Sequence, residues 1–175
     1  MIRSSVLAVA LASSIAPAAF ALDAGKANGF AVIDGVAIPL AFAVDTRKEN
    51  LFDAKKRDVV VVLTDKPLGA TRPDNEVDLS LRARRGELVV VALRIDGDTL
   101  VNVTVSYKGL NGLVVLPGPW FQYGPPKAGV GSLRLARREF DGHSYEMDVT
   151  FAATRYVAPP PATPPAAAPA APERP

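Results

Sequence analysis

Residues 76–106, EVDLSLRARRGELVVVALRIDGDTLVNVTVS, dominate the fold prediction because they contain three apolar runs separated by two glycine turns. The first run, residues 77–83, and the last, residues 101–105, alternate apolar with polar side chains, which is the period of a half-buried strand. The middle run, residues 88–95, is apolar at nearly every position and is predicted to be a central strand covered on both faces. The pattern indicates an antiparallel meander.

Two-residue turns at Arg85-Gly86 and Asp96-Gly97 would set the register of this meander. They would place Ala83 opposite Leu88, Leu81 opposite Val90, Ala92 opposite Val101, and Val90 opposite Val103. A slip of one residue would set Val and Leu against Asp, Ser and Asn, so the pattern favours this pairing. One buried face is therefore predicted to contain Val77, Leu79, Leu81, Val90, Val101, Val103 and Val105.

Both ends of the chain differ in composition from its middle. Residues 1–21 have Arg3, an apolar run over 6–15 and a small-x-small ending, Ala19-Phe20-Ala21, which is typical of a signal peptide. The apolar run is too short for a membrane anchor, which needs about 20 residues. Residues 158–175 are almost wholly Pro and Ala and are predicted to form a disordered tail. The prediction is one exported domain over residues 22–157, periplasmic or extracellular, without a transmembrane segment once the signal peptide is removed.

Composition excludes several classes of function. The chain has no cysteine, which excludes disulfides, thiolate catalysis and Cys-based metal centres. Of the 20 basic residues one is Arg3, so the chain after residue 21 has 19 basic against 18 acidic residues. This near balance gives no support for a nucleic-acid partner.

Further strands are predicted on both sides of the meander. Residues 29–44 place Asp34-Gly35 between two apolar runs, which predicts a hairpin, with Pro39 indicating an edge strand or a bulge. The charged segment 45–58 is predicted to be a solvated loop, pinned to the core edge by Leu51 and Phe52. A buried strand is expected over residues 58–64.

The C-terminal part is predicted to end in another hairpin. Residues 117–126, rich in Pro and Gly, are expected to form a long structured loop. Residues 129–139 and 144–154 are then paired through a three-residue turn that includes His143, with Leu135 opposite Val149 and Leu133 opposite Phe151. The eight or nine strands predict an antiparallel β-sandwich, immunoglobulin-like in general shape, with a small closed β-barrel as the alternative.

Three stretches carry a resemblance: the hairpin over residues 29–44, VVVVLTDKPL at 59–68 and YEMDVTF at 145–151. In these stretches the chain resembles uncharacterised secreted bacterial β-domain proteins. The resemblance implies a β fold and export. It implies no activity, cofactor or functional residue.

Catalytic patterns are weak throughout the sequence. His143 is the only histidine and no G-x-S-x-G motif is present, so we expect His143 to be exposed, with no carboxylate and hydroxyl arranged around its ring. Asp96-Gly97-Asp98 lacks the further ligands of a calcium loop. No metal or cofactor site is predicted. A hydrolase remains the alternative, using loop carboxylates drawn from Asp45, Asp53, Asp65 and Asp74.

Three aromatic residues, Trp120, Phe121 and Tyr123, are the candidate ligand-binding residues. If they are exposed on a rigid loop, they offer a flat face for a sugar ring; if they are buried, they fill the core. Two basic groups are weaker candidates: Lys55, Lys56 and Arg57, and Arg134, Arg137 and Arg138. The predicted function is a non-enzymatic binding or structural accessory module whose first candidate partners are carbohydrate or another cell-envelope component. A purely structural protein-interaction domain is a further alternative.

Overall fold

One curved antiparallel sheet and one short helix make up the computed structural model of the chain, which describes residues 22–50, 52–127 and 129–156 without the side chains of 111–115. The predicted signal peptide, 1–21, and the predicted tail, 158–175, lie outside the described residues. The elements are β1 Lys26–Ile33, β2 Val36–Glu49, β3 Arg57–Thr64, α1 Glu76–Arg84, β4 Val90–Asp96, β5 Thr99–Tyr107, β6 Leu110–Val115, β7 Phe121–Lys127, β8 Val130–Phe140, β9 His143–Ala152 and β10 Thr154–Arg155.

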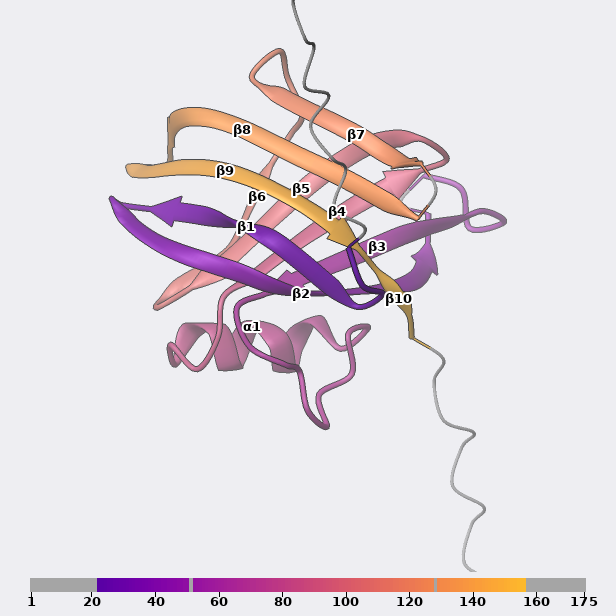
Figure 1. The fold of residues 1–175 in the computed structure, drawn as a ribbon, viewed down its shortest axis with the longest axis horizontal. Helices are drawn as coiled ribbons and strands as arrows, with labels where there is room; N and C mark the ends of the chain where they lie inside the picture. Colours follow the sequence, from indigo (N-terminus) through magenta and orange to yellow (C-terminus); the bar gives the residue numbers. More distant parts are fainter. Residues whose placement is uncertain (1–21, 51, 128, 157–175) are drawn as a thin grey trace, which may run out of the picture.

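The strands form a single sheet in the order β6-β5-β4-β3-β2-β1-β9-β8-β7, with β10 added parallel to β2. The sheet is nearly closed into a barrel, in which β8, β9, β1 and β2 pass in front of β4, β5 and β6 (Figure 1). This arrangement corresponds to the barrel alternative more closely than to the predicted sandwich. The long strand β2 is one cause, because residues 36–42 pair with β1 and residues 42–49 pair with β3. A strand shared in this way joins the two halves into one continuous, curling sheet.

The interior is filled by the inward-facing side chains of every second residue. On β9 the predicted alternation is confirmed, because Tyr145, Met147, Val149 and Phe151 are all buried. On β4, Val91, Leu93 and Ile95 face the same interior, while Val90 belongs to a second cluster under α1. The prediction that this strand is covered on both faces is therefore confirmed.

Residues 76–84 form α1, so the predicted first strand of the meander is wrong. Asn75 caps the helix, and its Oδ1 accepts a hydrogen bond from the Asp78 N–H at 3.2 Å. Acidic residues in the first turn and basic residues in the last turn interact favourably with the helix dipole and so stabilise the helix. Leu79 and Ala83, four residues apart, are buried against the sheet, whereas Val77 and Leu81 are exposed.

The register between β4 and β5 also differs from the prediction. Asp96 lies opposite Thr99, so the turn is Gly97-Asp98, and a bulge follows between Arg94 and Ile95. As a result Leu93 faces Val103 and Val91 faces Val105. Val90 lies opposite Ser106, on the outer face. The predicted shared face of Val90, Val101 and Val103 is therefore wrong.

The hairpin at Asp34-Gly35 is confirmed, with Ile33 opposite Val36 and both turn residues at positive φ. Pro39 pairs only with β1, because β2 begins to pair with β3 at Phe42; Pro39 therefore lies on a local edge, as predicted. The charged loop is shorter than predicted, since β2 extends to Glu49 and β3 begins at Arg57. Phe52 is 89% exposed and does not pin this loop, and Leu51 lies outside the described residues.

The last hairpin has a two-residue turn, Asp141-Gly142, with Phe140 opposite His143. The predicted three-residue turn is wrong because a bulge between Leu135 and Arg138 corrects the register instead, placing Leu135 opposite Met147 and Leu133 opposite Val149.

The predicted loop over residues 117–126 is also shorter than expected. Residues 121–127 form strand β7, with Phe121 opposite Leu135 on β8. A register shift between Gly124 and Lys127 contains the two prolines of this strand. Proline is tolerated here because β7 is the last strand of the sheet order and has one unpaired edge.

Candidate functional site

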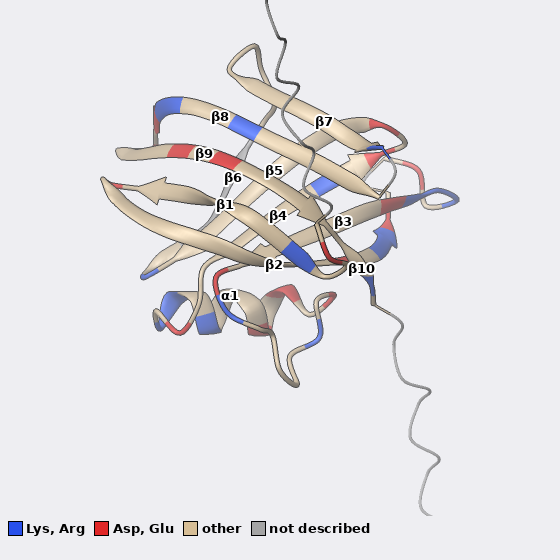
Figure 2. Cartoon of the chain, viewed as in Figure 1, with Lys and Arg blue, Asp and Glu red and all other residues tan. Residues whose placement is uncertain are grey.

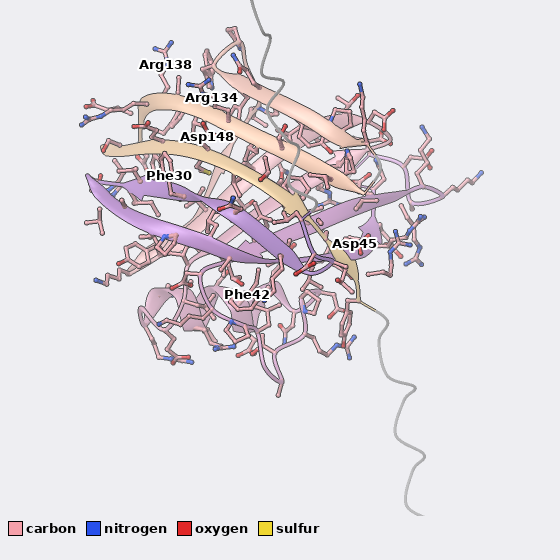
Figure 3. All side chains as sticks on the ribbon, in the orientation of Figure 1. Phe30, Phe42, Asp45, Arg134, Arg138 and Asp148 are labelled. Carbon is pink, nitrogen blue, oxygen red and sulfur yellow. The ribbon has the colours of Figure 1, made fainter. Side chains whose placement is uncertain are left out.

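A row of outward-facing side chains crosses five strands of the barrel. The directly opposite pairs are Gln122 with Arg134, Arg134 with Asp148, Asp148 with Phe30, and Phe30 with Pro39. Because opposite residues on one face lie about 5 Å apart, these side chains form a continuous surface. Figure 3 shows Phe30, Arg134 and Asp148 on neighbouring strands of this face.

A second row runs beside the first. Glu146 lies opposite Val32, and Val32 lies opposite Ala37. On β8 the bulge at Ala136 and Arg137 interrupts the regular ladder next to Glu146. Bulges often re-aim side chains beside functional sites, and here both bulge residues line a cavity.

This cavity, which we call the outer-face site, has a volume of about 550 Å³. Its lining combines Phe30, Gln122, Arg134, Arg137, Glu146 and Asp148 with Trp120 and the bulge residue Ala136. The size falls within the range of small-molecule sites in proteins. Charged and amide groups surround one exposed aromatic ring.

Opposite charges lie side by side across the outer-face site. Arg134 Nε is 3.7 Å from Asp148 Oδ2, and both side chains are more than half exposed. Figure 2 shows Lys and Arg on β8 next to Asp and Glu on β9. An exposed pair of this kind adds little to stability, so both groups can exchange partners with a ligand at small cost.

Trp120 lines the outer-face site but is not an open platform. The guanidinium of Arg138 lies 5.6 Å from its ring centroid, and Phe140 is tilted against it at 6.4 Å. A Cβ added at Gly118 would lie 2.6 Å from the indole, so the backbone approaches the ring closely there. The indole Nε1 is buried without a hydrogen-bond partner among the described residues.

Phe121 and Tyr123 turn toward the barrel interior. They lie opposite Leu135 and Leu133, and both are half-buried against the core. Burial raises the pKa of the Tyr123 hydroxyl. The three predicted aromatic residues therefore do not form a stacked, exposed face.

The exposed ring of the site is Phe30, which sequence reasoning missed. The alternation over residues 27–33 does place residue 30 on the face opposite Ala31 and Ile33. The alternation therefore predicts that Phe30 faces outward, but it does not indicate which strands pair with β1. Asp148 and Arg134 become its neighbours only through pairing with β9 and β8.

His143 lies at the end of the barrel that carries the β1–β2 and β8–β9 turns. Its Nδ1 is 2.7 Å from Asp34 Oδ2, and Asp34 Oδ1 accepts a hydrogen bond from the Ser144 N–H at 2.9 Å. The expectation concerned a carboxylate and a hydroxyl together at the two ring nitrogens; among the described residues, the contact found is that of the Asp34 carboxylate at Nδ1. Asp34 joins the β1–β2 turn to the β8–β9 turn through these contacts.

The predicted loop carboxylates each have a local partner. Asp45 Oδ2 accepts from Arg155 Nε at 2.9 Å, and Asp65 Oδ1 accepts from the Val89 N–H at 2.7 Å. Asp53 Oδ1 accepts from the Lys55 N–H, and Asp74 is paired with Arg72. None of these four carboxylates lines any of the four main cavities of the described part of the chain.

The two basic groups lie in different places. Lys55, Lys56 and Arg57 are exposed around the start of β3, away from the outer-face site. Arg134 and Arg137 line the outer-face site, and Arg138 contacts Trp120 at its border.

Among the residues the structure describes, no three His, Asp or Glu side chains gather where they could hold a metal ion. None of the helical residues described forms a span of membrane length and apolarity. Comparison of the chain with protein-family models, with curated proteins and with solved structures finds no match.

Proposed function

We propose that the protein is an exported, non-enzymatic binding module that holds a carbohydrate chain of the cell envelope on its outer-face site. The observation that carries this proposal is the row Gln122, Arg134, Asp148 and Phe30, which lies on one face of neighbouring strands. The aromatic ring offers apolar contact to the C–H face of a sugar. The planar polar groups beside it can each bond to two neighbouring hydroxyls.

The rigidity of the scaffold supports this function. The outer-face site stands on paired strands rather than on a loop, so its polar groups are held in position before a ligand arrives. The mixed charge of Arg134 and Asp148 suits a ligand that carries both donors and acceptors, as a saccharide does.

Export rests on the sequence pattern of residues 1–21. Mass spectrometry of the protein recovered from the periplasm or medium should therefore give a chain that begins near Leu22. Recovery of a chain that retains Met1 would contradict the export part of the proposal.

The binding test is retention by saccharides. The purified protein is sedimented with peptidoglycan sacculi and run by affinity electrophoresis in gels containing soluble glucan, xylan or pectin. Phe30→Ala and Ala136→Phe should each weaken retention at least tenfold, because one removes the ring and the other fills the cavity. Phe52→Ala, which removes an exposed ring outside this site, is the control and should bind like the wild type.

Each other outcome has a distinct meaning. No retention by any of these saccharides, or equal retention of both site variants, would contradict the proposal and favour the structural protein-interaction alternative. Release of reducing sugar ends would favour the hydrolase alternative, with Glu146 and Asp148 as its carboxylates in place of the predicted loop residues.

A further inference from the structure

A second cavity lies between α1 and the outer face of β3, β4 and β5, away from the strands that carry the outer-face site. We call it the helix groove; its volume is about 510 Å³. Its floor is a regular grid of outward-facing residues in three cross-strand rows. These rows are Val60, Arg94 and Asn102; Val62, Ala92 and Thr104; and Val90 and Ser106.

The grid divides the helix groove into an apolar wall and a polar wall. Val60 and Val62 on β3, with Leu79 of α1, form the apolar wall; they are 4%, 2% and 3% exposed, so a ligand would meet them at the bottom of the cavity. On β5 the corresponding positions are Asn102, Thr104 and Ser106, which present an amide and two hydroxyls. A ligand that matches both walls has an apolar body and hydrogen-bonding groups along one edge.

The charged groups at the groove already have partners. Arg94 Nε is 2.6 Å from Asp58 Oδ2, and the Arg94 guanidinium also donates to the Glu49 carbonyl. Glu76, at the start of α1, is paired with Lys48 at 2.6 Å. Asp58 is itself buried, so moving Arg94 toward an anionic ligand would leave a buried carboxylate without its cationic partner. The groove therefore favours an uncharged ligand.

Ser106 places a hydroxyl at the inner end of the polar wall. The residue is only 2% exposed and lines the helix groove, so a ligand would meet it only at the bottom of the cavity. A hydroxyl that opens onto a cavity gains a hydrogen bond when a ligand with a donor or acceptor fills that cavity. The deep end of the groove therefore favours a hydroxyl or carbonyl group of the ligand.

We infer that the helix groove is a second binding site, for a neutral amphiphile whose apolar body lies on Val60, Val62 and Leu79 and whose hydroxyl or carbonyl groups face Thr104 and Ser106. This site is separate from the outer-face site, since the two cavities share no residue. Its failure would leave the saccharide proposal untouched.

The experiment measures the fluorescence of N-phenyl-1-naphthylamine, an uncharged apolar probe, in the presence of the full mature chain. We expect fluorescence enhancement that Ala92→Phe abolishes by filling the floor of the groove. Ser80→Trp fills it from the helix side and should give the same loss even if Ala92→Phe fails to fold. Ala136→Phe, which fills the outer-face site instead, should leave the enhancement unchanged.

Displacement of the probe then tests the ligand class. Monolaurin, which has a neutral glycerol head, should displace the probe at a concentration at least tenfold lower than laurate, which has the same chain and an anionic head. Ser106→Ala should weaken displacement by monolaurin severalfold without changing probe binding. Absent enhancement, equal enhancement in Ser80→Trp, or preference for laurate would each overturn the inference.

Discussion

Gly29 lies where the backbone of β1 approaches the backbone of β9 closely. Its φ of +152° is unfavourable for other residues, and a Cβ there would lie 2.1 Å from the Asp148 carbonyl oxygen. Gly29→Ala must therefore separate β1 from β9 and should cost roughly 3 kcal/mol or more of unfolding free energy. Gly142→Ala is the matched control, because it has open space and should cost only about 1–2 kcal/mol of backbone strain. Urea denaturation checks both values; equal losses would contradict the close approach.

A second residue-scale prediction concerns pH. Hydrogen bonds from the Ser144 N–H and from His143 hold the pKa of Asp34 below its ordinary value of 3.8. A carboxylate with a lowered pKa stabilises the fold above its unfolded pKa, and this contribution is lost as pH falls through the folded value. Asp34→Asn, which still tolerates the positive φ at this turn, should therefore melt below the wild type at neutral pH.

The difference in melting temperature between wild type and Asp34→Asn should shrink as the pH is lowered below about 4. Thermal melts from pH 7 to pH 3 measure it directly. A difference that stays constant over this range would show that the Asp34 carboxylate contributes nothing through its charge.

Among the elements, α1 shows why sequence alone misassigned a segment. Apolar residues at 77, 79, 81 and 83 fit a strand by alternation, yet two of them, Leu79 and Ala83, are also four apart and fit one face of a helix. The sequence does contain the signals of a helix: Asn75 is a suitable N-cap, acidic residues follow it in the first turn, and basic residues lie in the last turn. Only the packing of Leu79 against β3 and β4 decides between the two structures.

The helix and the strand predict different results for neighbouring substitutions. Val77→Asp should change stability by less than about 0.5 kcal/mol, because Val77 is 71% exposed. Leu79→Ala should cost roughly 2–4 kcal/mol, because Leu79 is 3% exposed in the cluster under α1. Denaturant midpoints of the two variants measure the contrast. Similar losses would support the strand.

Other elements were predictable to different degrees. The turn at Asp34-Gly35 and the buried strand over residues 58–64 follow from local chemistry, and both are confirmed. The registers of the β4–β5 and β8–β9 hairpins were not predictable, because each depends on a bulge that lies away from the turn. Of the outer-face site, the sequence indicates Trp120, Arg134 and Arg137 as candidates, whereas Phe30 depends on strand order, which the sequence leaves open.

At the scale of the whole molecule, the strand order explains why sandwich and barrel could not be separated from sequence. Both architectures use the same short strands and glycine turns; they differ in whether one sheet curls or two sheets stack. Here β1 pairs with β9, so the first and last long strands of the barrel are neighbours. The unpaired edges, β6 and β7, come from the interior of the sequence.

This topology predicts that the chain can be circularly permuted. Gly25 N–H donates to the Ala152 carbonyl at 2.6 Å, so a Gly/Ser linker of about eight residues, spanning roughly 15 Å, should join residue 156 to residue 22 without distortion. New ends between Leu116 and Pro117 interrupt only the connection from β6 to β7, which are not neighbours in the sheet. We expect this permutant to keep its near-ultraviolet circular dichroism and cooperative unfolding.

The matched control opens the chain between Val61 and Val62 instead, inside β3. That strand is buried and pairs with β2 and β4 on either side, so cutting it removes hydrogen bonds from two ladders and divides the core. The control should lose its near-ultraviolet signal and unfold without a cooperative transition. If the first permutant behaved like this control, the connection between β6 and β7 would be essential to the barrel, and the pairing of β1 with β9 would not be enough to hold the sheet together.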